Sequence, residues 1–278
     1  MKAARSLPLV SVVITTRNEE RHIWDCLQSV RKQDYGNIEA IVVDNSSSDR
    51  TKGIARKFTK LVFNKGPERS AQRNFGVSKS KGKYVLYLDA DMILTPSVIS
   101  ECVGISEADS RVAGIYIPER IIGSGFWIRV RDFERGFYNA TVIDCVRFVS
   151  RKAFDNVKGF DETMTGPEDW DFDRKIRRQG KTVLITSELL HNEGSFNLTK
   201  YVSKKGYYAK DMQKYAQKWG DDEEVRKQLG ASYRLFGVFV ENGKWKKLLS
   251  SPILTSGMLC LRVMVGLSFL GSKFRRSS

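Results

Sequence analysis

Short β-branched runs alternate with helical patterns through most of this sequence, and this alternation limits the fold more than any other feature. The run 9–15 is continuously apolar, as in a strand buried on both faces, and 20–31 carries apolar residues at helical spacing. Further strands are predicted at 39–43, 60–63, 84–88 and 112–117, with helices at 49–58, 68–78 and 96–106 between them. Strands that alternate with helices predict right-handed crossovers, and hence an α/β protein with a mostly parallel sheet.

Polar clusters directly follow three of these strands, at 15–19, 44–49 and 89–91. Ligands of parallel sheets bind beyond the carboxyl ends of the strands. We therefore expect the three clusters to converge at one edge of the sheet and to form the functional site.

Composition restricts the class of protein and the kind of partner. The 278 residues are 41% hydrophobic and 28% charged, with a mean hydropathy of −0.36, which disfavours both disorder and a polytopic membrane protein. The net charge of +15 favours polyanionic partners such as nucleic acid, phosphorylated small molecules or an anionic membrane face. The four cysteines lie far apart without zinc-site spacing, so we expect buried free thiols in a reducing compartment.

The second half of the chain is less regular. We expect a loop and a helix over 119–148, a helix starting near Pro167, a strand at 182–185 and a helix over 198–218. The aromatic and basic stretch 195–208 suits either single-stranded nucleic acid or a membrane-facing or acceptor-binding helix. We favour the second, because the clusters at the strand ends already account for nucleotide chemistry.

Asp89 and Asp91 form an Asp-x-Asp pair at a predicted strand end. Two such carboxylates can hold Mg²⁺ or Mn²⁺ against a diphosphate, because these cations prefer oxygen ligands. The alternative is that the pair caps the following helix.

Glu168 and Asp169 form a second acidic cluster, at the predicted start of a helix. One of them could serve as a general base for an incoming hydroxyl group. The alternative is an acidic first turn that forms salt bridges with Arg174 or Arg177.

Four motifs occur in an order that resembles the family 2 glycosyltransferases, which have the GT-A fold. They are 10–20 (VSVVITTRNEE), 42–51 (VVDNSSSDRT), 73–91 with Arg73-Asn74-x-Gly76 and GKYVLYLDAD, and 167–171 (PEDWD). The resemblance extends over residues 9–195. It implies a Rossmann-like catalytic domain, and an inverting transfer of a sugar from a UDP- or GDP-linked donor to an acceptor hydroxyl.

The resemblance also implies roles for individual residues. Thr15 and Asp44 would line the base and ribose site, with Asn45 where many members have a second Asp, and with Arg73 near the nucleotide. Asp91 would be the principal ligand of Mn²⁺ or Mg²⁺, Asp89 would face the ribose or the metal, and His191 would be a further ligand. Asp169 would be the general base, and Glu168 would help to position the acceptor.

The last part of the chain predicts a membrane-associating helical tail, residues 231–278, after a catalytic domain of residues 1–230. The run 253–270 is apolar, but Arg262 near its middle disfavours a straight transmembrane helix, leaving an interfacial or hairpin helix or one packed on the catalytic domain. Cations flank the run on both sides: Lys244, Lys246, Lys247, Lys273, Arg275 and Arg276. We expect a protein at the cytoplasmic face of the membrane, with a glycan, lipid-linked glycan or polyprenyl phosphate as acceptor.

Two other functions fit parts of the pattern. A non-enzymatic nucleotide- or nucleic-acid-binding module could keep the sheet without the chemistry, but the two acidic pairs argue against it. A sugar nucleotidyltransferase would also use metal-binding acids, but residues 15–18 lack the glycine-rich loop that cradles a triphosphate. We therefore expect no nucleic-acid partner.

Overall fold

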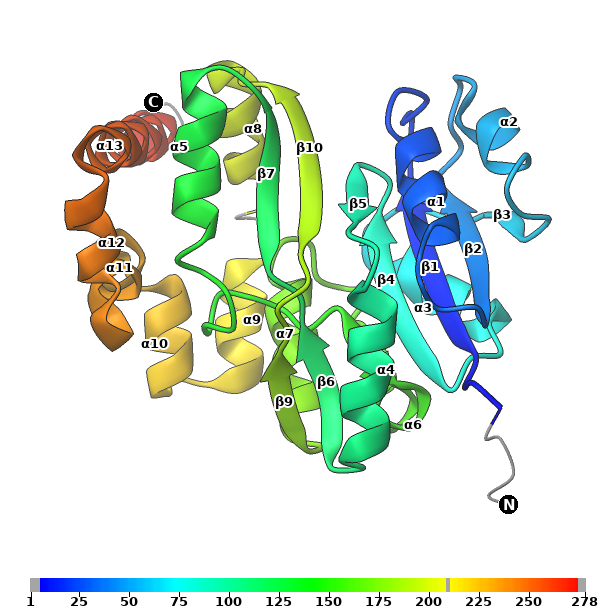
Figure 1. Cartoon of the computed structure of the whole chain (residues 1–278). Coiled ribbons are helices and arrows are strands. Elements are labelled where there is room, and N and C mark those ends of the chain that lie inside the picture. The colour runs from blue at the N-terminus through cyan, green and yellow to red at the C-terminus, as the bar shows by residue number, and fades with distance from the viewer. Residues whose placement is uncertain (1–5, 209–210, 275–278) are drawn as a thin grey trace.

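A seven-stranded sheet forms the centre of the computed structural model, which describes residues 6–208 and 211–274, with side chains for 6–203 and 211–265 (Figure 1). The strand order is β3-β2-β1-β4-β8-β6-β9, and every pairing is parallel except the two made by β8. The predicted α/β class is therefore confirmed. The strands are β1 (Val10–Thr16), β2 (Ile38–Asp44), β3 (Val62–Asn64), β4 (Tyr84–Asp89), β6 (Val112–Tyr116), β8 (Phe148–Ser150) and β9 (Lys181–Leu184).

Both faces of this sheet are covered by helices, as the continuous apolar runs require. Val12 and Ile14 of β1 pack on one face, and Val13 between them packs on the other. The first face is covered by α1 (Ile23–Arg31), α2 (Thr51–Ala55) and α4 (Val98–Ala108). The second is covered by α3 (Arg69–Lys79), α6 (Arg151–Asn156) and α7 (Glu168–Arg177).

A second sheet of three strands, in the order β5-β10-β7, extends beyond the carboxyl end of β4. Its strands are β5 (Met92–Leu94), β7 (Glu119–Ser124) and β10 (Leu189–Ser195), with α5 (Phe126–Arg135) following β7. The expectation of only a loop and a helix over 119–148 is wrong, because this region also contains β7 and β8. The partner of β7 lies about seventy residues further along the chain, so no local pattern reveals the pairing.

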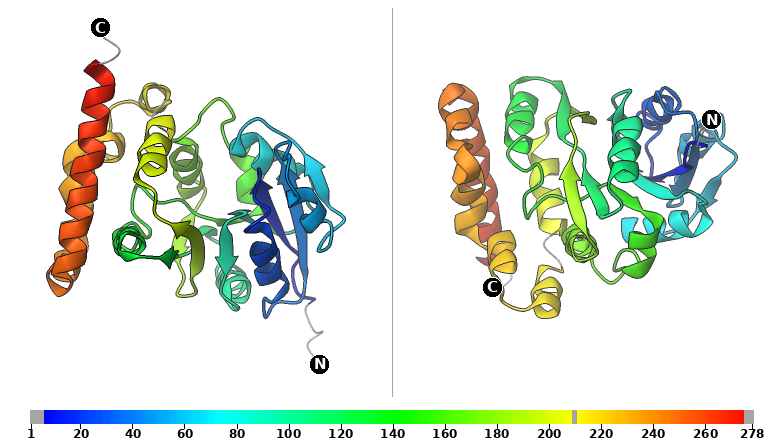
Figure 2. Two further views of the ribbon diagram at one scale, coloured as in Figure 1. Left: turned by 90° about the horizontal axis from the view of Figure 1, so that it is seen from above. Right: turned by 60° about the horizontal axis from the view of Figure 1, so that its bottom comes forward.

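Helices form the remainder of the described chain. They are α8 (Leu198–Tyr208), α9 (Met212–Trp219), α10 (Glu223–Leu229), the π-helical turn η1 (Tyr233–Gly237), α11 (Val238–Val240), the 3-10 turn η2 (Glu241–Gly243), α12 (Trp245–Ser250) and α13 (Pro252–Phe274). α13 runs along one side of the molecule (Figure 2). Met258 and Leu261 of α13 share a hydrophobic cluster with Val130 and Phe133 of α5.

The predicted apolar run 253–270 lies within a single longer helix, α13, which spans Pro252–Phe274, whereas the preceding part of the predicted tail forms several short helices and turns. Arg262 lies against α5, where its guanidinium is 2.6 Å from the Glu134 carboxylate. No helix within the described residues combines the length and apolar character needed to cross a bilayer. The side chains of Lys204 and Lys205 and those of the cations from Lys273 onward lie outside the described residues.

The cysteines are free, but they are not all buried as expected. Cys26 and Cys102 are buried, Cys145 is half-buried and Cys260 is exposed. Cys260 lies on the uncovered face of α13, which the apolar sequence around it does not reveal.

Candidate active site

The carboxyl ends of β2, β1 and β4 lie side by side where the strand order reverses direction. Thr15 is in register with Asp89, and Thr16 with Asp44. The Thr15 hydroxyl donates to Asp89 Oδ1 at 2.8 Å. Open α/β sheets bind ligands at such a switch point, so the predicted convergence of polar clusters is present.

Asp44 and Asn45 shape the loop after β2. Asp44 is fully buried, and its Oδ2 accepts the Ser47 backbone N–H at 2.8 Å. The Asn45 amide donates to the carbonyl oxygen of Pro67, which joins this loop to the segment before α3. These hydrogen bonds fix the loop at the strand end. That Asp44 and Asn45 contact a nucleotide stays a prediction.

Two arginines one turn apart on α3 connect the strand-end acid to the acids at the start of α7. Arg73 donates to Asp89 at 3.3 Å and to Asp169 at 2.6 Å, and its side chain is only 1% exposed. Arg69 lies 3.5 Å from Asp89 and 3.0 Å from Glu168. Burial alone would raise the pKa of Asp89, but Arg73, Arg69 and Arg147 hold it well below its ordinary value.

Glu168 and Asp169 are neighbours in sequence but differ in their surroundings. The Glu168 side chain is 3% exposed and accepts hydrogen bonds from Arg69 and from the backbone N–H of Gly166. Burial, with the charge of Asp169 beside it, raises the pKa of Glu168. Asp169 is 30% exposed, so it is the one of the two that a substrate can reach.

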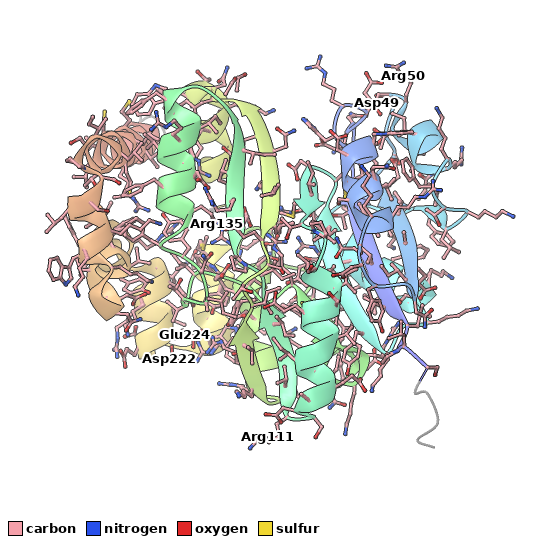
Figure 3. The ribbon with its side chains drawn as sticks, viewed as in Figure 1. Asp49, Arg50, Arg111, Arg135, Asp222 and Glu224 are labelled. Atoms are coloured by element: carbon pink, nitrogen blue, oxygen red, sulfur yellow. The ribbon has the colours of Figure 1, made fainter. Side chains whose placement is uncertain are left out.

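The remainder of α7 is held by ion pairs with α10. Arg174 pairs with Asp222, and Arg177 pairs with both Asp173 and Glu224. Figure 3 labels Asp222 and Glu224 at the base of the molecule. Asp173 also accepts the backbone N–H of Val146 at 3.0 Å. The alternative interpretation, in which Arg174 or Arg177 pairs with the first-turn acids, is not what the structure shows, because these arginines pair with Asp222 and Glu224 while Asp169 pairs with Arg73.

A hydrogen-bonded line of three side chains, Asp91, His191 and Glu119, lies across β10. His191 Nε2 is 3.1 Å from Asp91 Oδ2, and its Nδ1 is 2.9 Å from Glu119 Oε1. Burial disfavours a charged imidazole, but the hydrogen bonds to Asp91 and Glu119 raise the pKa of His191 to about 10. The ring is therefore protonated at neutral pH in the absence of a cation.

Glu119 is anchored from its other side by two arginines. Arg147 is 3.1 Å and Arg135 is 3.3 Å from Glu119 Oε2, and Arg135 also contacts Asp144 at 2.9 Å. Burial alone would raise the pKa of Glu119, but Arg135, His191 and Arg147 hold it well below its ordinary value. Arg147 also interacts electrostatically with Asp89 and Asp169. It therefore links the acids around Arg73 to Glu119, the outer partner of His191.

The residues present fit a divalent cation held by two protein ligands. A carboxylate and an imidazole, Asp91 and His191, meet at one point, and Glu119 holds the second ring nitrogen as the outer partner of a metal-binding histidine does. Mg²⁺ characteristically uses one or two protein ligands together with substrate phosphates. The structure does not gather Asp89 with these two, and no group of three or more such ligands occurs among the described residues.

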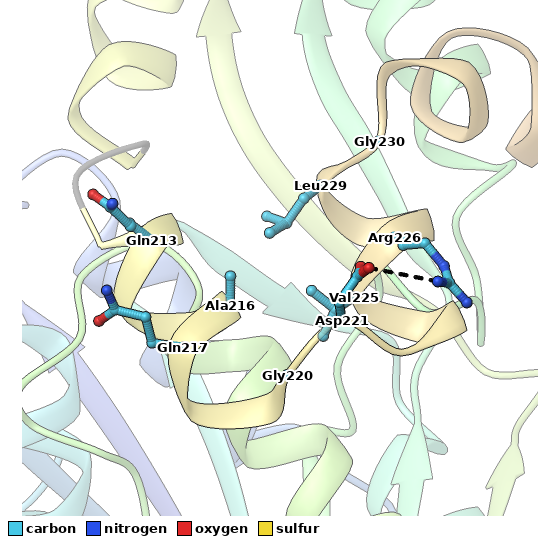
Figure 4. Close-up of a pocket in the computed structure, with 9 residues that line it drawn as sticks. All are labelled: Gln213, Ala216, Gln217, Gly220, Asp221, Val225, Arg226, Leu229 and Gly230. Atoms are coloured by element: carbon cyan, nitrogen blue, oxygen red, sulfur yellow. Dashed lines mark ion pairs between the residues drawn. The ribbon is translucent and has the colours of Figure 1, made fainter.

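A separate hollow of about 630 Å³ lies between α9 and α10 (Figure 4). Arg226 and Asp221 pair across its rim at 3.6 Å. None of the acidic or basic residues described above lines it, so it is distinct from the candidate site.

The family profile described as "Glycosyl transferase family 2" matches residues 11–167, more than half of the chain. This chain belongs to the family 2 glycosyltransferases. The match begins within β1 and ends just before α7, so it includes the Thr15, Asp44 and Asp89 strand ends.

Several curated glycosyltransferases resemble parts of the chain. "Glycosyltransferase AglE" of Haloferax volcanii is 39% identical over 95 residues, 31% of this chain and 31% of that protein. "Chondroitin synthase" of Escherichia coli is 23% identical over 208 residues, 69% of this chain and 30% of that protein. The matched region thus spans about a third of the length of these relatives.

Solved structures of similar fold include two that bind nucleotide sugars. A mannosyltransferase of Pyrobaculum calidifontis, in complex with GDP-Man and Mn²⁺, aligns over 96% of this chain and 81% of its own, with a TM-score of 0.59 and 18% identity. TarS 1–349 of S. aureus, in complex with UDP-GlcNAc, aligns over 95% and 92%, with a TM-score of 0.60 and 16% identity. These likenesses establish the GT-A fold of this family member.

Four site residues were not identified from the sequence: Arg69, Glu119, Arg135 and Arg147. Arg69 precedes Arg73 by four residues, so helical spacing places both on the face toward α7. Glu119 and Arg147 carry no comparable signal, because each reaches the site through long-range strand pairing.

Proposed function

We propose that this glycosyltransferase moves a sugar from a nucleotide-diphosphate donor to an acceptor hydroxyl with inversion at the anomeric carbon. The observation that carries the proposal is the buried Arg73 guanidinium, which holds Asp89 at the nucleotide edge of the sheet and Asp169 at the start of α7. The groups for the donor and for the acceptor therefore belong to one site. A binding module without catalysis would have no need for Asp169 to be reachable there.

The reaction we propose is a single displacement. The acceptor oxygen forms a bond to the anomeric carbon while its proton passes to an Asp169 carboxylate oxygen. The bond from that carbon to the phosphate oxygen breaks, and the nucleoside diphosphate leaves with the electron pair. Attack from the face opposite the leaving group inverts the configuration.

The neighbouring side chains position Asp169 and do not react. Arg73 fixes one of its oxygens at 2.6 Å, and Arg69 with Glu168 anchors the first turn of α7. Glu168 is too buried to touch an acceptor directly, so its contribution to acceptor binding is to hold this turn in place.

We propose that Asp91 and His191 hold the divalent cation, either Mn²⁺ or Mg²⁺. When bound, the cation would neutralise charge on the diphosphate and act as a Lewis acid toward the leaving group. The Mn²⁺ in the Pyrobaculum calidifontis structure supports a cation in this fold.

The donor is proposed to carry UDP or GDP, since the similar structures hold UDP-GlcNAc and GDP-Man. Thr15, Asp44 and Asn45, at the ends of β1 and β2, are proposed to meet the base and ribose. Calorimetric titration with UDP and GDP, each with and without Mn²⁺, identifies the base and the cation requirement in one experiment. A chain that binds neither nucleotide in any condition contradicts the proposal.

We propose a lipid-carried acceptor, a polyprenyl phosphate or lipid-linked glycan. The support is the set of exposed apolar side chains on α12 and α13, such as Leu249 and Ile253. Comparison of transfer to a polyprenyl phosphate in micelles with transfer to a water-soluble glycan tests this. Preference for the soluble glycan would reject it.

Asp169→Asn tests the catalytic assignment. Donor affinity should stay within about twofold, while turnover falls by roughly 10²–10⁴-fold because proton removal is lost. Asp155→Asn is the matched control, since Asp155 is exposed on α6 and has no place in the site. Near-normal turnover of Asp169→Asn would remove Asp169 from the role of base.

A further inference from the structure

Large apolar side chains are exposed along one stretch of the chain, from η1 to α13. Thirteen large hydrophobic residues are exposed among the described residues, and eight of them lie between 235 and 263. We refer to these eight as the apolar strip: Leu235, Phe236, Val240, Trp245, Leu249, Ile253, Leu259 and Val263. Monomeric proteins seldom expose so many large apolar residues in one region unless the surface binds something.

α13 shows most clearly that apolar surface is left uncovered. This helix is apolar on two faces, but only one of them is covered by the rest of the chain. Gly257, Met258 and Leu261 are buried against α5. Leu259 and Val263, four residues apart on the opposite side, are exposed by 45% and 61%. A helix that is apolar all round is normally covered all round, so the outer face lacks its covering in the described chain.

The same region is rich in cations. Between residues 233 and 265 the sequence has five basic side chains and a single carboxylate, Glu241. Lys246 is exposed on α12, between Trp245 and Leu249, so positive charge borders the apolar strip directly. The basic residues are Arg234, Lys244, Lys246, Lys247 and Arg262.

We propose that the apolar strip is a docking surface for an anionic lipid bilayer, which it contacts without crossing. Charge selects this occupant over a second copy of the chain, because a symmetric dimer would bring two like-charged basic borders together, whereas anionic headgroups attract them. The proposal is independent of the sugar-transfer chemistry, and its test uses no substrate.

The structure favours an α13 that lies along the boundary between the bilayer and water. Arg262 is held by Glu134 on the protein side of α13, so the buried face stays attached to α5 while the outer face meets lipid. Trp245, 47% exposed, is the residue type that favours the headgroup layer.

Flotation of the full chain with vesicles tests the surface. Vesicles of phosphatidylcholine alone are compared with vesicles that also contain phosphatidylglycerol. The variant Leu249→Glu/Ile253→Glu should bind anionic vesicles roughly tenfold more weakly or worse, because two exposed apolar side chains become charged. Leu184→Glu is the matched control, since Leu184 is 42% exposed on β9 of the main sheet, and it should float as the wild type does.

Two further measurements separate lipid from other occupants. Lys246→Glu should weaken binding to anionic vesicles by roughly fivefold or more and leave binding to neutral vesicles unchanged. A blue shift of tryptophan emission on vesicle addition should be lost in Trp245→Phe. Circular dichroism melting of each variant confirms that it is folded.

Three results would overturn the proposal. The first is a wild-type chain that floats with neither kind of vesicle, or equally with both. The second is a Leu249→Glu/Ile253→Glu variant that floats like the wild type. The third is a wild-type dimer, seen by light scattering, that this variant converts to monomers and that ignores vesicles, because the strip would then be covered by a second copy.

Discussion

Replacement of Arg73 by Met measures how strongly one buried guanidinium holds the two halves of the site together. The substitution keeps most of the buried stem and removes the charge that lies 2.6 Å from Asp169 and 3.3 Å from Asp89. The guanidinium also lies over the rings of Tyr87 and Phe160, at 4.7 and 5.0 Å. Two carboxylates and two aromatic faces therefore lose their partner at once.

The expected cost follows from burial. Removal of one partner from a buried ion pair costs about 3–5 kcal/mol. Asp89 and Asp169 keep 19% and 30% of their side-chain exposure, so water partly replaces the lost contact and the lower end, about 3 kcal/mol, applies. At ~2–4 °C per kcal/mol for a chain of this size, Tm should fall by about 6–12 °C.

Thermal unfolding followed by circular dichroism, in buffer containing EDTA, is the assay. Arg73→Lys should lose less than Arg73→Met, because an ammonium group keeps the charge but reaches only one carboxylate well. Arg111→Met is the control, since Arg111 is 81% exposed in its pair with Asp109, and its Tm should match the wild type (Figure 3). An Arg73→Met variant that melts with the Arg111→Met control would refute the reasoning.

Three further predictions test other parts of the structure. EDTA should abolish sugar transfer, and added Mn²⁺ or Mg²⁺ should restore it. His191→Ala should require roughly 10–100-fold more metal for the same activity. Full activity in EDTA would show that the site works without a cation. Burial raises the pKa of Asp173 from 3.8 to about 6, so the folded state holds its proton more tightly and stability falls as pH rises from 4 to 6. Urea unfolding should therefore show the wild type losing about 2–3 kcal/mol relative to Asp173→Asn between pH 4 and pH 7, and a pH-independent difference would contradict this. Arg262→Met should lower the free energy of unfolding by about 1–3 kcal/mol because Glu134 loses a buried partner, and an unchanged urea midpoint would show that this pair does not hold α13 to α5.

The parallel half of the sheet was predictable because burial on both faces leaves continuous apolar runs such as 10–14. β7 was missed because its residues, Glu119 to Ser124, are polar at their ends and depend on pairing with β10. α13 was predicted as an apolar segment, but its division into a covered and an uncovered face depends on where α5 lies.

In the site, too, local sequence predicts where single residues lie, but not which distant residues they contact. Asp89 and Asp91 stand at a strand end, and Glu168 and Asp169 at a helix start, so local pattern places all four. Their grouping does not follow from local pattern: Asp89 joins the acids of α7 through Arg73, whereas Asp91 joins His191, one hundred residues away.

The balance of charges in the site supports the proposed divalent cation in a chain that is itself strongly basic. Every carboxylate of the site already contacts a cationic group, and Arg135 also pairs with Asp144: the acids are Asp89, Asp91, Glu119, Glu168 and Asp169, and the cations are Arg69, Arg73, Arg135, Arg147 and protonated His191. A diphosphate that enters this site would add negative charge where each of these arginines already contacts a carboxylate. The proton on His191 is the one positive charge in this set that a divalent cation held by Asp91 and His191 could replace, and that exchange would raise the local charge by one. We therefore expect that the excess of +15 over the whole chain does not replace the proposed cation beside the diphosphate of the donor.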